Sequence, residues 1–178
     1  MKKKTLWITE TAVMIALLIA LQAVTKPAGQ FVTGSCVNLV LAMSVMVGGL
    51  WCGVTVALLS PFFAFLLSIG PALLPVVPLV AVGNIVLVAV LYFITGKHLT
   101  PKSPMAWAGV AAAAAAKCLT LYLMIVKMLI PALSLPAKQA AVLSASFSWP
   151  QIVTALIGGT LAALITPAVR KALQKKQA

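Results

Sequence analysis

Acidic side chains are almost absent from this chain of 178 residues, which contains one glutamate, Glu10, and no aspartate. Its one histidine, His98, lies beside Lys97 in a short polar stretch. Hydrolysis of the glycosidase type uses a pair of carboxylates, and a conventional metal centre draws several ligands from histidine, cysteine and acidic side chains. The sequence also offers no clear pair of nucleophile and base. It therefore disfavours an enzyme, and it predicts neither a metal centre nor a cofactor.

Cysteine is scarce as well, with three thiols at Cys36, Cys52 and Cys118. No two of them have the C-x-x-C spacing of a metal or redox motif, and all three lie within or beside apolar stretches. Cysteines in such places behave as small buried hydrophobic residues. The sequence therefore predicts no disulfide framework.

Apolar residues dominate the chain instead. They make up 63% of the sequence, more than a soluble domain of this size buries, so we interpret the chain as an integral membrane protein. Thirteen lysines and arginines give a formal net charge of +12. These cations cluster at the predicted membrane edges, as the positive-inside rule and contact with anionic lipids require. Nucleic-acid binding is therefore rejected as the explanation of the charge.

The apolar stretches predict six membrane helices in a single all-α domain. No clean cleavage site follows the first apolar run, so we interpret it as a helix and not as a signal peptide. The second apolar stretch is too long for one span, and Gly48, Gly49 and Gly53 divide it. The predicted helices are residues 5–24, 36–50, 53–69, 76–95, 105–130 and 148–170.

Six spans place both termini and the basic loop 97–102 on the cytoplasmic side, whereas five would separate the two basic termini. The polar segment 25–35 then forms the first outer loop, and the segment 131–147 forms the last, with a short helix expected near residues 137–145. Ser148 and Gln151 have the spacing of a capping box, which predicts the start of the last helix.

Lys117 directly follows a run of six alanines, residues 111–116, in the middle of the fifth predicted helix. A cation at that depth costs at least about 2.5 kcal/mol and usually faces a cavity or a partner. The small alanines allow neighbouring helices to approach closely. We therefore predict that Lys117 lines a binding chamber. Two alternatives are that it snorkels or contacts a backbone carbonyl, or that it pairs with Glu10 across about 18 Å.

Other polar side chains are predicted near the outer end of this chamber. The last helix directs its positive N-terminal end and its free amide groups into the same region, which favours an anion. Trp149 offers a plane on which a ring could stack, although such a tryptophan is also a common membrane anchor. Asn38 and Gln22 either line the chamber or bond across helices. The predicted ligand is a small, partly planar anion, and the predicted binding residues are Lys117, Asn84, Trp149, Gln151, Lys127, Asn38 and Gln30.

Small residues recur at every fourth position of the first helix, at Ala12, Ala16 and Ala20. This spacing places them on one face as a smooth groove, which suits a partner helix. Packing within the chain is the alternative explanation.

With these features the chain resembles the substrate-binding S components of energy-coupling factor (ECF) vitamin transporters of prokaryotic cell membranes. The resemblance rests on the six spans, the basic N-terminus, Ala12-x-x-x-Ala16, Gly83-Asn84 and Trp149-Pro150-Gln151. It implies capture of a vitamin-like nutrient from outside, under a cap formed by the first loop. It also implies assembly with a membrane coupling subunit, which Ala12, Ala16 and Ala20 contact, and with two cytoplasmic ATPases. The chain has no Walker motif of its own.

Two other functions remain open at this stage. One is a stand-alone secondary transporter, although the scarcity of acids within the membrane argues against proton or sodium coupling. The other is a membrane scaffold that transports nothing.

Overall fold

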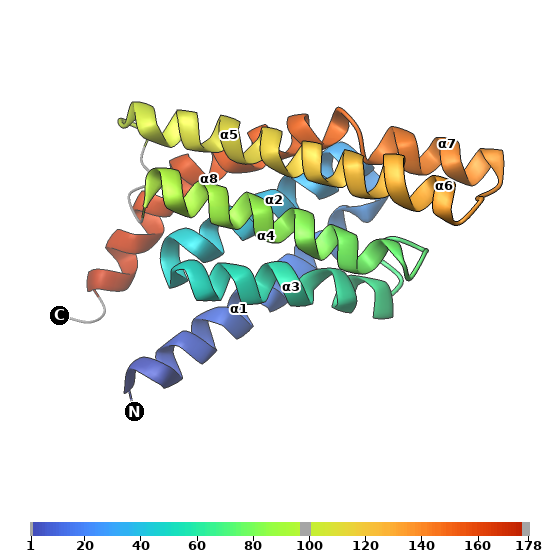
Figure 1. Ribbon diagram of the computed structural model, residues 1–178. Helices are drawn as coiled ribbons and strands as arrows, with labels where there is room; N and C mark the ends of the chain where they lie inside the picture. The colour runs from blue at the N-terminus through green and yellow to red at the C-terminus, as the bar shows by residue number, and fades with distance from the viewer. Residues whose placement is uncertain (1, 97–100, 176–178) are drawn as a thin grey trace.

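The computed structural model describes residues 2–96 and 101–175, and all regular structure within these ranges is helical (Figure 1). The predicted polar residues Lys97 and His98 lie outside the described part. The elements are α1 (Lys2–Thr25), η1 (Lys26–Ala28), α2 (Gln30–Gly48), α3 (Leu50–Leu66), α4 (Val76–Thr95), α5 (Pro104–Leu121), η2 (Tyr122–Leu129), α6 (Ile130–Ala132), α7 (Ala137–Ser146) and α8 (Pro150–Lys175).

Six apolar helical segments of the described chain have the character of membrane spans. Five are at least 18 residues long, and the sixth, α3, has 17 residues. The segments α5, η2 and α6 follow one another directly and together form the span Pro104–Ala132. Large apolar side chains such as Leu58, Phe62 and Leu66 are exposed on the outside, as a lipid environment requires. The predicted all-α membrane bundle is confirmed.

Helix α2 occupies the centre of the bundle and packs against α1, α3, α4 and α8. Its closest approach is to α8, where a Cβ atom on Gly158 would lie only 2.6 Å from both the backbone nitrogen of Leu39 and the carbonyl oxygen of Ser35. The glycine thus allows two backbones to touch. This contact holds the middle of α2 against α8 and positions Asn38 between them.

Helix α2 begins earlier than the sequence predicts. Residues 30–35, which we assigned to a polar first loop, form its first turns, and the connection from α1 is only η1 and Gly29. Gly29 makes this short connection possible because its φ of +86° is in the region that glycine adopts without strain. Gly34 lies against the side chain of Thr154 on α8, so packing between helices offsets the low helix propensity of this polar segment.

The start of α8 also differs in detail from the prediction. The helix begins at Pro150, but Ser148 and Gln151 do not form a capping box. The Ser148 hydroxyl donates to the carbonyl of Ala145, and the Gln151 side chain donates to the carbonyl of Ser146. Because α7 ends immediately before α8, its last carbonyls are nearer acceptors than the partners that a capping box would use.

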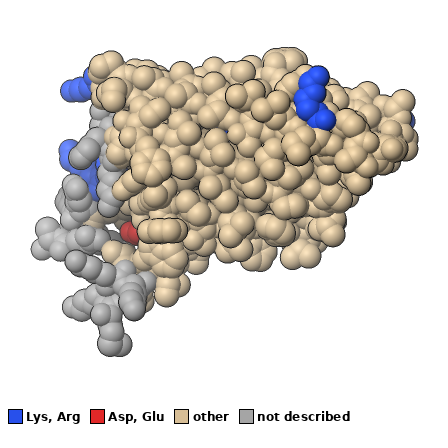
Figure 2. Space-filling model, in the orientation of Figure 1, with Lys and Arg blue, Asp and Glu red and all other residues tan. Residues whose placement is uncertain are grey.

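Both chain ends lie at one end of the bundle, and α6 and α7 lie at the other (Figure 1). On the face seen in Figure 2, described lysines and arginines appear at the end that carries the termini and also toward the opposite end, and the surface between them carries no blue or red side chain. At the end with the termini the Arg170 guanidinium donates to the carbonyl of Met46 in the last turn of α2, a favourable place for a cation.

The contact at Gly158 predicts an unequal effect of two neighbouring substitutions. Gly158→Ala is expected to destabilise the protein by about 1–3 kcal/mol, because the new methyl group meets backbone atoms that cannot move aside. Gly159→Ala is the matched control, since its methyl group meets the side chain of Val110, which can rotate. Thermal unfolding in detergent measures both. An equal loss in the two variants would contradict the proposed backbone contact.

Candidate functional site

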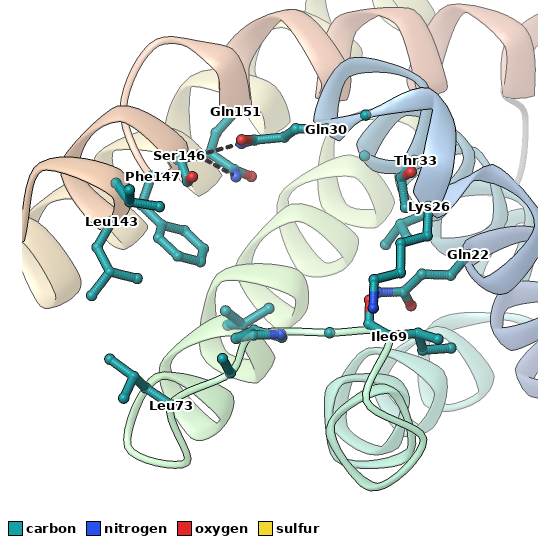
Figure 3. A pocket seen from close by; sticks show the side chains of 18 of the residues that line it. Gln22, Lys26, Gln30, Thr33, Ile69, Leu73, Leu143, Ser146, Phe147 and Gln151 are labelled. Atoms are coloured by element: carbon teal, nitrogen blue, oxygen red, sulfur yellow. Dashed lines mark hydrogen bonds between the residues drawn. The ribbon is translucent and has the colours of Figure 1, made fainter. Parts of the chain in front are cut away.

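A cavity of about 740 Å³ lies at the end of the bundle opposite the chain termini. Residues of α1, η1, α2, the α3–α4 connection, α4, α5, α7 and α8 line it. A close view shows one wall formed by α1, η1 and the connection after α3, and the facing wall formed by α7 and the start of α8 (Figure 3). Among the labelled residues, Gln22, Lys26 and Ile69 belong to the first wall, and Leu143 and Phe147 belong to the second.

Lys117 lies at the buried side of this cavity, with only 3% of its surface exposed. Its ammonium group donates to Asn38 Oδ1 at 2.6 Å and to Asn84 Oδ1 at 2.7 Å. Because an ammonium group can only donate, both carboxamides must turn their oxygen atoms toward it. The Nδ2 group of Asn38 then donates to Thr154 Oγ1 at 3.2 Å. The network therefore joins α5, α2, α4 and α8.

The charge of Lys117 has no counter-ion within the described chain. Both of its hydrogen-bond partners are neutral amides, and no acidic residue lines the cavity. Glu10, the only acid in the sequence, lies instead beside Gly48 at the end of α2 near the termini, which excludes the alternative in which it pairs with Lys117. Hydrogen bonds to a charged group contribute about 1.5–3 kcal/mol each, whereas burying an ion costs several kcal/mol. An anion bound in the cavity would offset the remaining cost of burying the charge of Lys117.

The rest of the cavity wall is largely apolar, with further cations at the exposed rim. Val37, Val80 and Leu143 contribute apolar surface to the wall. The exposed side chains of Lys26 and Lys138 also belong to the lining. The Lys26 ammonium donates to the carbonyl of Ser68 at 2.6 Å, which ties η1 to the connection after α3. A ligand with an anionic group and an apolar body suits these surroundings.

A single carbonyl joins three elements above the cavity. The carbonyl oxygen of Ser146, in the last turn of α7, accepts hydrogen bonds from Gln30 Nε2 at 2.6 Å and from Gln151 Nε2 at 2.9 Å (Figure 3). The two glutamines belong to the first turns of α2 and α8. These bonds fix α7 against the bundle as part of the cavity wall.

The backbone amides at the start of α8 are not available to a ligand, contrary to the prediction. The amide of Gln151 donates to the carbonyl of Ser148, and the amide of Ile152 donates to the carbonyl of Trp149, both at 3.0 Å. Because Pro150 has no amide hydrogen, the first turn of this helix offers few free donors. Helix α8 therefore contributes the side chain of Gln151 to the cavity.

The structure brings five of the seven predicted binding residues together around the cavity and leaves two outside its lining. Trp149 is 63% exposed and packs against Phe31, with ring centroids 5.5 Å apart. Lys127 is exposed on the π-helical segment η2, with its ammonium group 5.6 Å from the centre of the Tyr122 ring. The five lining residues are Lys117, Asn84, Asn38, Gln30 and Gln151.

Several residues at the site were not predicted from the sequence. Thr154 follows Gln151 by three positions, which places both side chains on one face of the helix. This spacing could have predicted Thr154 as a neighbour of the site. Lys26 is the only cation of the predicted first loop, residues 25–35, and no binding role was predicted for it. Phe147 and the lining residues of α7 had no signal, because an isolated aromatic residue in a loop indicates nothing specific.

The alanine stripe of α1 faces away from the bundle. Ala12, Ala16 and Ala20 are all exposed, while Met14 and Leu18 on another face of the same helix are buried against α2 and α3. Packing within the described part of the chain therefore does not explain the stripe.

Comparison with known proteins gives one match. A family model described as the ECF transporter substrate-specific component matches residues 8–170. Neither the curated proteins nor the solved structures gave a match. The matched region begins in the second turn of α1 and ends in the last turns of α8, so it includes part or all of each of the six apolar spans and every residue that lines the cavity. The chain therefore belongs to the family of substrate-specific components of ECF transporters.

Proposed function

We propose that this protein captures a small, vitamin-like anion from outside a prokaryotic cell with high affinity, for uptake by an ATP-driven importer. The observation that carries the proposal is the buried ammonium group of Lys117 beside a cavity of about 740 Å³ with no acid in its lining. A bound anion neutralises this charge away from water, where the attraction between charges is strong. Asn84, Asn38, Gln30 and Gln151 supply the neighbouring polar groups.

The charge distribution supports an outward-facing cavity. In the sequence, basic residues concentrate near both termini and between α4 and α5, and the start of α1, the end of α4 and the end of α8 lie at the end of the bundle opposite the cavity. By the positive-inside rule, that end lies on the cytoplasmic side of the plasma membrane. The cavity then opens to the outside, with η1 at its rim.

Energy for uptake has to come from partner subunits in this proposal. The only acid of the chain lies far from the cavity, so no carboxylate is available there to couple transport to protons or sodium ions. A membrane coupling subunit docks on Ala12, Ala16 and Ala20, and two cytoplasmic ATPases drive it. Uptake by vesicles that lack those ATPases would favour the rival function of a secondary transporter.

Removing the buried charge is expected to weaken ligand binding more than tenfold. Lys117→Met keeps most of the side-chain volume but offers neither charge nor donors to the anion. Native mass spectrometry of the purified protein first identifies the compound that it retains, and isothermal titration then measures the affinity of both forms for it.

The matched control is Lys127→Met, which removes the same charge from an exposed position outside the cavity lining. It is expected to change the affinity less than twofold. Equal affinity of Lys117→Met and the unchanged protein would remove Lys117 from the binding site.

A bulky residue in the alanine stripe is expected to separate binding from uptake. Ala16→Trp should leave the affinity for the retained compound unchanged, because this exposed position does not line the cavity, and should abolish uptake by cells that contain the partner subunits. Ala111→Trp places the same side chain at an exposed position of α5 and should retain uptake. Normal uptake by Ala16→Trp would refute the docking role.

A further inference from the structure

We infer that the ligand carries a carboxylate that binds between Lys117 and Asn84, and that Asn84 is the residue that selects a carboxylate over its neutral amide. The inference rests on the proposed function, because it describes the ligand of the same cavity. It also goes further, since it assigns different roles to two asparagines that hold the same ammonium group.

One of the three N–H donors of the Lys117 ammonium group has no hydrogen-bond acceptor among the described residues. Of its three hydrogens, two are directed to Asn38 Oδ1 and Asn84 Oδ1, and no third acceptor is present among the described residues. The two bonds limit where the third hydrogen can point, so they orient it as well as holding the charge. Since Lys117 is part of the lining, a ligand atom in the cavity can accept this hydrogen.

The two asparagines differ in what their amino groups do. Asn38 Nδ2 is occupied by Thr154 Oγ1 at 3.2 Å. Asn84 Nδ2 donates to no described residue, although only 2% of the surface of Asn84 is exposed. The described polar atoms that are both fully enclosed and without a partner are Ser60 Oγ and Thr166 Oγ1, so Asn84 Nδ2 keeps some access to open space. Because Asn84 lines the cavity, that space is the cavity.

The cavity therefore presents two neighbouring donors, one charged and one neutral. They are joined through Asn84 itself, whose oxygen accepts from Lys117 at 2.7 Å while its amino group belongs to the same rigid plane. Two adjacent donors suit the two oxygen atoms of a carboxylate. A phosphate carries up to two charges on three oxygen atoms, which is more than these two donors match, and the first amides of α8 are already bonded. One buried cation matches one negative charge.

This arrangement also fixes the direction of the ligand. Lys117 and Asn84 are deeply buried, whereas Lys26 and Lys138 are exposed at the other side of the lining. The carboxylate consequently lies innermost, and the body of the ligand lies between the apolar side chains of Val37, Val80 and Leu143.

The test compares carboxylates with their primary amides in two isosteric variants. In Asn84→Asp the new carboxylate pairs with Lys117, and its second oxygen replaces the amino group that faces the cavity. The variant should lose carboxylate binding at least about tenfold and should gain binding of the amide, which can now donate to that oxygen. In Asn38→Asp the charge of Lys117 is also neutralised, but the second oxygen faces Thr154, so carboxylate binding should fall with no gain for the amide.

The probes are the compound retained by the purified protein, where it is an acid, and the pairs benzoate with benzamide and hexanoate with hexanamide. Equilibrium dialysis and thermal shift in detergent measure binding. Support requires that the unchanged protein bind at least one carboxylate about tenfold more tightly than its amide, and that Asn84→Asp alone reverse this preference. A reversed preference cannot arise from unfolding, so a general loss of stability does not imitate it.

Three results overturn the inference. They are binding of no carboxylate by the unchanged protein, equal binding of acid and amide, and the same gain for the amide in both variants. If the protein instead retains an anion that has no carboxylate and also takes it up in cells, the carboxylate inference fails and the proposed capture of an anion stands. If it retains and takes up nothing, both fail.

Discussion

The structure of this protein depends on one interaction, the bonds from the buried Lys117 ammonium group to the oxygen atoms of Asn38 and Asn84. Neutral acceptors hold the cation in the bundle without cancelling its charge. An aspartate at either position would form an ion pair, and the cavity would lose its attraction for an anion. The two asparagines come from α2 and α4 and the lysine from α5, so these bonds also fix how three helices meet.

Small residues make that meeting possible. Ala113 and Ala114, one helical turn before Lys117, are almost fully buried, as are Ala162 and Ala163 on α8. Gly158 allows α8 to touch the backbone of α2 within one turn of Asn38. Without these close approaches the side chains of Asn38, Thr154 and Lys117 would be too far apart to bond. The alanine-rich sequence of α5 is thus part of the site, although none of its methyl groups needs to contact a ligand.

The sequence predicted the elements that depend on composition and missed those that depend on neighbours. An isolated lysine in an apolar span can be recognised from the sequence alone, and so can asparagines in such spans. Whether Trp149 faces a cavity or the outside depends on the rotation of α8, which is set by contacts with α2 and α5. The helical start of α2 and the bonds of Ser148 depend on Thr154 and on the end of α7, neither of which a local pattern includes. The π-helical segment that contains Lys127 had no signal in the sequence either.

Under the proposed function, the buried charge of Lys117 makes release of the bound ligand unfavourable. The anion that neutralises Lys117 leaves behind a buried cation with two neutral partners, so departure of the ligand restores an unfavourable state that costs several kcal/mol. Tight capture and fast release are therefore in conflict as long as the cavity stays intact. The network itself has to change for release, most directly by separation of α2, α4 and α5, which hold its three members. Since no other ionisable group of the lining is near enough in the buried part to relieve the charge, that separation needs work from outside the chain. A substrate-specific component that delivers its ligand to an ATP-driven partner meets this requirement, whereas a bundle acting alone does not.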